Sequence, residues 1–97
     1  MQRRLLESKP YEGLKHSTHI DVEVIYSKDR SPRGYYIRVF PVKHENGMVT
    51  YTMLTSKSQL LMKTKRYSDK QFEQAVELGR EAAPELIKLV LEREKTA

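Results

Sequence analysis

Residues 35–54, YYIRVFPVKHENGMVTYTML, decide the fold because two strand-like runs flank the dipeptide Asn46-Gly47. Both central residues of a two-residue type I′ turn need a positive φ, which Gly tolerates freely and Asn better than most other residues. The stretch therefore predicts a β-hairpin that turns at these two residues. The turn also sets the register, and we expect these opposite pairs: Glu45 with Met48, Val42 with Tyr51, Phe40 with Met53, and Arg38 with Thr55.

This register gives the hairpin two unlike faces, because successive side chains of a strand point to opposite sides of a sheet. One face carries Tyr36, Arg38, Phe40, Val42, Tyr51 and Met53. The other face carries Ile37, Val39, Pro41, Thr52 and Leu54. Two partly apolar faces need two different partners, and the face that mixes Tyr, Phe and Arg is the one suited to meet a nucleic acid.

The residues before the hairpin predict one strand, one loop and one arm. Residues 20–26 alternate between apolar and mostly polar side chains, as a half-buried strand does. Residues 27–34 are rich in turn formers and predict a loop with a basic tip of Lys28, Arg30 and Arg33. Residues 1–18 predict a flexible basic N-terminal arm, which leaves residues 19–97 as a single domain.

The residues after the hairpin predict a further strand and a helix. Residues 56–66 fit either a strand or a short helix, and we favour a strand because it would cover another edge of the hairpin. Ser68 with Gln71 three residues later is typical of a helix start. Apolar residues then recur every three or four positions as far as Leu91. Pro84 cannot donate a hydrogen bond to the carbonyl of Arg80, so we expect the helix to kink or break there.

The order of these elements predicts an α+β fold. We expect an antiparallel sheet of three to four strands followed by a long C-terminal helix that is broken near Pro84. The helix should pack on the face that holds Ile37, Val39 and Leu54. The face with Tyr36, Arg38 and Phe40 would then point away from it.

Composition favours a partner that carries negative charge. The 97 residues have a net charge of +5, and residues 55–70 hold five basic residues against one acidic residue. Such a concentration of charge fits a polyanion. The chain has no cysteine, no segment resembling a signal peptide and no apolar run long enough to span a membrane. We therefore expect a cytoplasmic protein that does not engage a membrane.

The aromatic and basic face predicts a surface for single-stranded nucleic acid. Bases stack on Tyr and Phe rings, while Arg and Lys neutralise the phosphates between them. The residues expected to do this are Tyr36, Arg38, Phe40, Tyr51, Lys57, Lys63, Lys65, Arg66, Arg30 and Arg33. The same residue types also suit a homodimer interface or the core of the domain, so these alternatives stay open.

Catalysis and metal binding have little support in the sequence. His16, His19 and Asp21 lie close together along the chain but lack a fourth ligand at a recognisable spacing. Neither a nucleophile with a companion base nor a pair of catalytic carboxylates stands out. We therefore expect a non-enzymatic protein without a cofactor.

Two short segments resemble the positive-cofactor-four family of transcriptional coactivators. Arg33-Gly34-Tyr35-Tyr36-Ile37-Arg38 resembles the second strand of that family, and Ser68-Asp69-Lys70-Gln71-Phe72 resembles the start of its helix. The resemblance covers about a dozen residues and implies a small dimeric domain, a curved four-stranded sheet followed by a helix, that binds single-stranded DNA. The chain departs from that family in the longer stretch between the two segments and in its longer helix, which contains Pro84.

These observations predict a homodimeric module that binds single-stranded DNA or RNA with little sequence specificity. The alternative is a protein-interaction adaptor or dimerisation domain that uses the same face or an edge strand.

Overall fold

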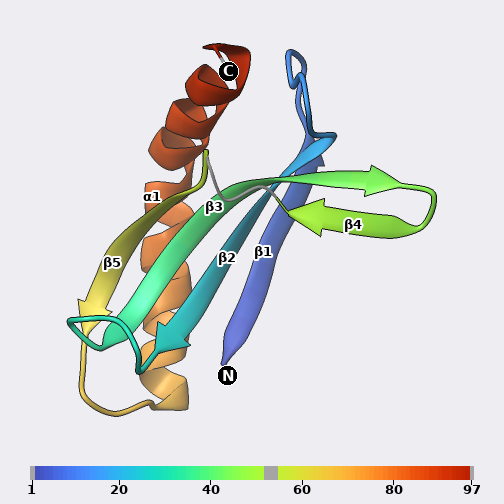
Figure 1. Cartoon of the computed structure of the whole chain (residues 1–97). Helices are drawn as coiled ribbons and strands as arrows, with labels where there is room; N and C mark the ends of the chain where they lie inside the picture. The colour runs from blue at the N-terminus through green and yellow to red at the C-terminus, as the bar shows by residue number, and fades with distance from the viewer. Residues whose placement is uncertain (1, 52–54, 97) are drawn as a thin grey trace.

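An antiparallel sheet lies against one long C-terminal helix in the computed structural model, which describes residues 2–51 and 55–96 (Figure 1). The fold class is therefore α+β, as the sequence predicts. The described residues form five strands and one helix: β1 Arg3–Pro10, β2 His19–Ser27, β3 Gly34–Glu45, β4 Met48–Tyr51, β5 Lys57–Lys63 and α1 Asp69–Thr96. β1, β2 and β3 are neighbours in that order, and both β4 and β5 pair with the other edge of β3.

The predicted hairpin is confirmed at its turn. Asn46 and Gly47 have φ values of 53° and 78°, and Glu45 pairs with Met48 as Val42 does with Tyr51. The expected partner of Arg38 is wrong, because Ser58 of β5 takes the place that we predicted for Thr55. β4 is only four residues long, and β5 covers the rest of the edge, which brings Leu61 and Met62 against the core. Thr52, Met53 and Leu54, which complete the two predicted faces, lie outside the described residues.

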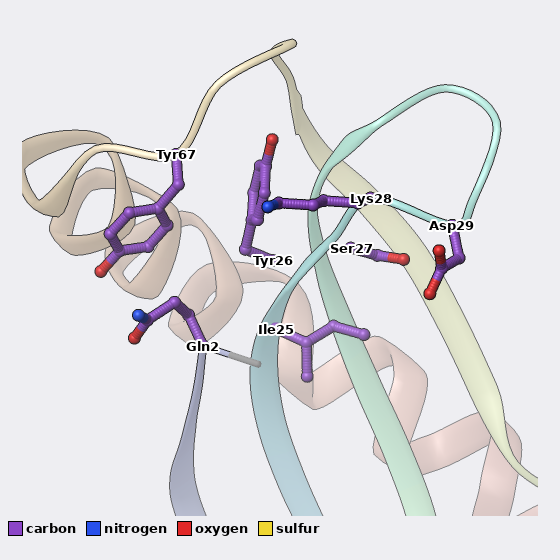
Figure 2. A pocket seen from close by; sticks show the side chains of 7 residues that line it. All are labelled: Gln2, Ile25, Tyr26, Ser27, Lys28, Asp29 and Tyr67. Carbon is purple, nitrogen blue, oxygen red and sulfur yellow. The ribbon is translucent and has the colours of Figure 1, made fainter.

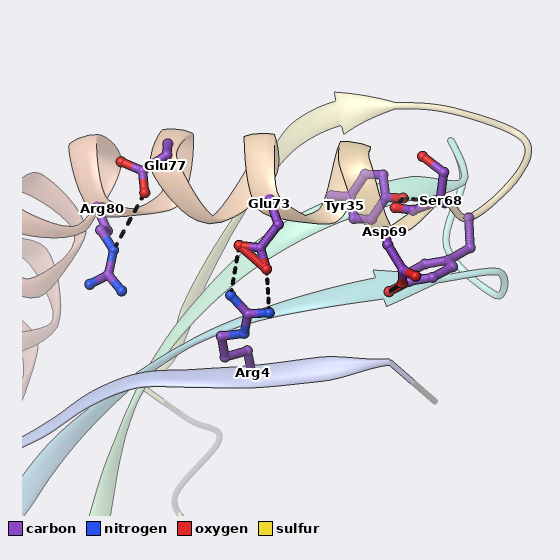
Figure 3. Close-up of polar contacts among 8 residues, drawn as sticks. Arg4, Tyr35, Ser68, Asp69, Glu73, Glu77 and Arg80 are labelled. Carbon is purple, nitrogen blue, oxygen red and sulfur yellow. Dashed lines mark hydrogen bonds and ion pairs between the residues drawn. The ribbon is translucent and has the colours of Figure 1, made fainter.

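β1 corrects the prediction of a flexible N-terminal arm. Residues 3–10 pair with β2 along its outer edge, with an irregularity between Leu5 and Glu7. The pairing satisfies backbone groups of β2 that would otherwise form an open edge. Leu6 also packs against the core, and Arg4 binds Glu73 of α1 through two hydrogen bonds (Figure 3). These contacts keep the segment in an ordered strand although its composition is mostly polar. The prediction of a strand after the hairpin is confirmed by β5.

α1 covers one face of the sheet, and the alternation of side chains along β3 decides which face this is. Tyr35, Ile37 and Val39 pack towards the helix, together with the alternate residues of β2: Ile20, Val22, Val24 and Tyr26. Tyr36, Arg38 and Phe40 therefore point away from α1, as predicted. The helix lies so close to the sheet that a Cβ atom on Gly79 would approach Cγ2 of Val24 to 2.8 Å.

The start of α1 follows the sequence prediction. The Ser68 hydroxyl accepts the backbone N–H of Gln71 at 3.1 Å, which caps the helix. The Tyr35 hydroxyl donates to the Ser68 carbonyl at 3.0 Å and accepts its N–H at 2.9 Å, so the core of the sheet holds the cap in place (Figure 3).

The predicted break near Pro84 is wrong, because α1 is one continuous helix of 28 residues that contains Pro84. Pro84 is exposed and removes one hydrogen-bond donor from the helix. Ala83, Leu86, Ile87 and Val90 are buried on either side of it and continue the apolar stripe against the sheet. The packing of these side chains keeps the helix intact despite the missing hydrogen bond.

Candidate nucleic-acid interface

We call the face of the sheet that points away from α1 the distal face. The predicted binding residues on this face form two groups. Tyr36 belongs to the first group and is only 7% exposed. Its hydroxyl donates to the Pro32 carbonyl at 2.6 Å. The guanidinium of Arg30 lies 4.7 Å from the centre of its ring and donates to the Ser58 hydroxyl at 2.6 Å. The Tyr36 ring is thus covered by a cation that is itself held in place.

Arg38, Phe40 and Tyr51 form the second group. Phe40 is 4% exposed, and the guanidinium of Arg38 lies 5.4 Å from the centre of its ring. The rings of Phe40 and Tyr51 are 5.5 Å apart. Tyr51 is 54% exposed and is the one predicted stacking residue whose ring is largely accessible. Tyr36 and the position opposite Tyr51 are six residues apart along β3, or about 20 Å at the usual rise of a strand.

Two carboxylates that the sequence analysis did not assign to the site lie on the distal face, on β2, opposite Arg38 and Phe40 of the second group. Glu23 Oε1 is 3.2 Å from Arg38 Nη1, and Glu23 Oε2 is 3.9 Å from Arg3 Nε. Asp21 accepts a hydrogen bond from the Ser8 hydroxyl. Both acidic residues are buried. The alternation of residues 20–26 already placed them on one face, but only the pairing of β2 with β3 shows that Glu23 stands opposite Arg38.

Lys57 is separated from the other predicted binding residues. It pairs with Val39, and directly opposite residues of a sheet share a face, so Lys57 lies on the side covered by α1. It is half-buried there. The central part of the distal face therefore offers a neutralised and covered surface, without the row of cations that the sequence predicts.

The remaining basic residues gather at one end of the molecule. Figure 1 shows the β2–β3 loop, the end of β5, the β5–α1 loop and the start of α1 together at this end. We call it the basic end and define it by Lys28, Arg30, Arg33, Lys63, Lys65, Arg66 and Lys70. These seven residues are accompanied by only Asp29 and Asp69, a balance of +5 that equals the net charge of the whole chain.

Hydrogen bonds to backbone carbonyls hold the two loops of the basic end in place. The Thr64 N–H donates to the Arg33 carbonyl at 3.1 Å, which ties one loop to the other. The Tyr26 hydroxyl donates to the Lys65 carbonyl at 3.1 Å, and the Thr64 hydroxyl donates to the Arg66 carbonyl at 3.0 Å. The side chains of Lys65 and Arg66 remain exposed. The charged groups thus extend from a backbone that is already ordered.

A cavity of about 460 Å³ opens beside the basic end, between the start of β1, the end of β2 and the β5–α1 loop (Figure 2). Its lining combines apolar, aromatic and polar side chains: Gln2, Ile25, Tyr26, Ser27, Lys28, Asp29 and Tyr67. Figure 2 shows Gln2, Tyr26 and Tyr67 on one side of it and Ile25, Ser27 and Asp29 on the other. The sequence analysis did not identify this cavity, because Gln2 and Tyr67 are far apart along the chain.

Tyr67 at the rim of the cavity is held in its neutral form. Its hydroxyl donates to Asp69 Oδ1 at 2.7 Å. This hydrogen bond, followed by partial desolvation and the negative charge of Asp69, raises the pKa of Tyr67 to about 12. The ring also contacts Tyr26 and Phe72 edge to face, at centroid distances of 5.6 and 5.8 Å. Its orientation is therefore fixed from both ends.

Metal clusters and membrane-spanning helices were sought in residues 2–51 and 55–96. No three His, Cys, Asp or Glu side chains there are grouped so that they could hold a metal ion. No helix in this part of the chain has the length and apolar character needed to cross a membrane. Comparisons of the chain with protein-family models, with curated proteins and with solved structures found no match.

Proposed function

We propose that this chain is a non-enzymatic module that binds single-stranded DNA or RNA with little sequence specificity through its basic end. The observation that carries the proposal is the charge of this end, where two hydrogen-bonded loops and the adjoining ends of β5 and α1 present seven basic residues from separate parts of the sequence. Cations that neutralise phosphates supply the sequence-independent part of nucleic-acid affinity. The cytoplasmic location and the homodimer expected from the sequence complete this proposal.

Arg33, Lys63, Lys65 and Arg66 would contact the phosphates. Arg30 adds a flat surface, because a base can stack on a guanidinium plane as well as on an aromatic ring. The plane of Arg30 already lies over Tyr36 and is held by Ser58, so such a stack would need little ordering.

The exposed acidic row of α1 limits where a strand can lie. Glu73, Glu77, Glu81 and Glu85 follow one another at intervals of four residues and are all exposed. Their charges repel phosphates, so a bound strand would stay at the basic end and would not extend along the helix. The resemblance of residues 33–38 and 68–72 to a family that binds single-stranded DNA is in keeping with this placement.

A matched pair of double variants tests the proposal. Lys65→Glu with Arg66→Glu reverses two charges at the basic end, and Lys88→Glu with Arg93→Glu makes the same change in net charge on the exposed side of α1. We expect the first variant to lose at least tenfold in affinity for a single-stranded 20-mer at low salt, and the second to lose far less. Affinity of the unaltered protein should fall steeply as salt rises. Equal losses in both variants, or no binding by the unaltered protein, would refute the proposal.

A second candidate function, dimerisation or protein interaction, is favoured by β4. Met48 and Val49 are 70% and 47% exposed, and β4 contains no charged residue. The β3–β4 hairpin extends away from α1 in Figure 1, and the outer edge of β4 is unpaired among the described strands. Edge strands that avoid pairing are usually protected by charge or by Pro. If a second copy pairs here, sedimentation should show a dimer that Val49→Lys dissociates, whereas a monomer at tens of micromolar would exclude it.

A further inference from the structure

The cavity beside the basic end has the size and lining of a site for a small planar ligand. Its volume of about 460 Å³ falls within the range of roughly 300–1,000 Å³ that such sites occupy. Ile25 and the rings of Tyr26 and Tyr67 supply apolar surface. Both tyrosine hydroxyls are already engaged, with the Lys65 carbonyl and with Asp69, so the two rings are fixed in position.

Polar groups of the lining match the edge of a nucleobase. The Gln2 carbonyl accepts the Tyr26 N–H at 3.0 Å, and this bond anchors Gln2 at the cavity. Its side-chain amide lies on the same side of the cavity as the Tyr67 ring in Figure 2. A carboxamide presents one donor and one acceptor group and can turn over, so it can pair with the edge of any base. The Ser27 oxygen accepts the N–H of Arg30 at 3.2 Å, which leaves its own proton to donate.

The surroundings of the cavity place a phosphate on one side of it. The exposed Lys28 side chain runs towards the Tyr26 ring in Figure 2. Lys65 is joined to the cavity through the bond between its carbonyl and the Tyr26 hydroxyl. Asp29, on the other side of Ser27, would repel a phosphate. A ligand with a flat ring and an attached phosphate would therefore direct the phosphate towards Lys28 and the basic end.

We propose that this cavity holds one nucleotide, with its base against the Tyr67 ring, its base edge at Gln2 and its phosphate at Lys28. The inference rests on the proposed function, because it assigns the base-binding site that belongs to the phosphate contacts of the basic end. The nucleotide can come from a strand or from solution, since both offer the same base and phosphate.

Two fluorescently labelled strands separate the cavity from the basic end. One is a 12-mer of deoxythymidine, and the other has the same backbone with abasic sugars throughout. We expect the full-length chain to bind the first strand about tenfold more tightly at low salt, because base stacking on an aromatic side chain contributes roughly that factor. Gln2→Ala should weaken the thymidine strand about fivefold and leave the abasic strand unchanged, because it removes one hydrogen bond. Gln74→Ala, an exposed glutamine of α1, is the matched control and should change neither.

Lys28→Ala provides the opposite control, because loss of a phosphate contact should weaken both strands equally. A titration with thymidine monophosphate, monitored by NMR through the amide resonances of Ser27 and Lys28, identifies the source of the nucleotide. If the amide resonances shift with the free nucleotide, the site takes a nucleotide from solution. If they shift only with the thymidine strand, the site takes a nucleotide of a strand. Either result supports the site. If the two strands bind equally well and Gln2→Ala has no effect, the cavity is not a nucleotide site although the proposed function stands. If neither strand binds, both proposals fail.

Discussion

Between Tyr35 and Val42 both faces of β3 are largely buried, but different kinds of side chain cover them. On the face towards α1, Ile37 and Val39 are fully buried by the apolar side of the helix. On the distal face, Tyr36 and Phe40 are almost as inaccessible, yet guanidinium groups of Arg30 and Arg38 lie over their rings. Side chains of this small domain are therefore buried in two ways, either by apolar packing or beneath a charged side chain.

The difference matters because removing the helix and removing a guanidinium group cost different amounts of free energy. Separating α1 from the sheet would expose a continuous apolar core and unfold the protein. The guanidinium of Arg30 can move aside and keep its charge in water, so the Tyr36 ring beneath it can become accessible at little cost. The distal face is thus the side of the sheet on which a ligand can replace a cover without loss of the fold.

The sharpest test of this comparison uses one residue type on each face. Ile37 and Ile25 lie on neighbouring strands and are 0% and 4% exposed, but Ile25 also lines the cavity beside the basic end. Ile37→Ala should lower the free energy of unfolding by about 2–5 kcal/mol, because it leaves a closed void. Ile25→Ala should cost about 1–2 kcal/mol less than that, because water can enter the space from the cavity. Denaturant unfolding measures both, and equal losses would contradict the distinction between the faces.

The next largest effect concerns the buried carboxylate of the distal face. Glu23→Gln keeps the shape of the side chain but removes the charge that faces Arg38 at 3.2 Å. We expect a loss of about 1–3 kcal/mol, less than for a fully buried pair, because the side chain of Arg38 keeps 23% exposure. Glu45→Gln is the control, since Glu45 pairs with Lys43 at the surface and should contribute about 0–1 kcal/mol. A loss for Glu23→Gln no larger than the control would mean that Glu23 does not organise this face.

The sequence was a good guide to what local rules decide. The turn at Asn46-Gly47, the alternation along β3 and the cap at Ser68 each depend on a few adjacent residues, and all three are found in the structure. The sequence also predicted the side of β3 on which α1 packs, because only one of the two alternating sets of side chains along this strand is rich in aliphatic residues.

The features that the sequence analysis predicted wrongly depend on contacts between distant residues. β1 is polar in composition and becomes a strand only because β2 offers it an edge and α1 offers Glu73 to Arg4. The continuity of α1 at Pro84 depends on the sheet beneath it. The division of the predicted site into two groups follows from the point along β3 at which β5 replaces β4. None of these can be read from spacing alone.

A smaller effect should follow when one guanidinium cover is removed. Arg30→Ala takes away the cation 4.7 Å from the centre of the Tyr36 ring, and we expect it to lower the free energy of unfolding by only about 0.5–1 kcal/mol. It should also reduce the salt dependence of oligonucleotide binding by about one phosphate contact. Lys43→Ala, at the opposite end of β3, is the control for the salt dependence. A loss of several kcal/mol for Arg30→Ala would show that this cover is as permanent as the helix.

The last prediction concerns Tyr67, which lies between the helix-covered core and the cavity, and its effect appears only in alkaline solution. The hydrogen bond to Asp69 raises the pKa of Tyr67 to about 12, so the folded state favours the neutral phenol. Its contribution to stability is complete below the pKa of the unfolded chain, about 10, and is lost as the pH rises through about 12. The ultraviolet absorbance of tyrosinate should therefore include a late ionisation near pH 12 that belongs to Tyr67. Asp69→Asn should move it towards 10, whereas Asp29→Asn, in the β2–β3 loop, should leave it in place. A late ionisation that persists in Asp69→Asn would mean that packing against Tyr26 and Phe72, and not the carboxylate, keeps the phenol neutral.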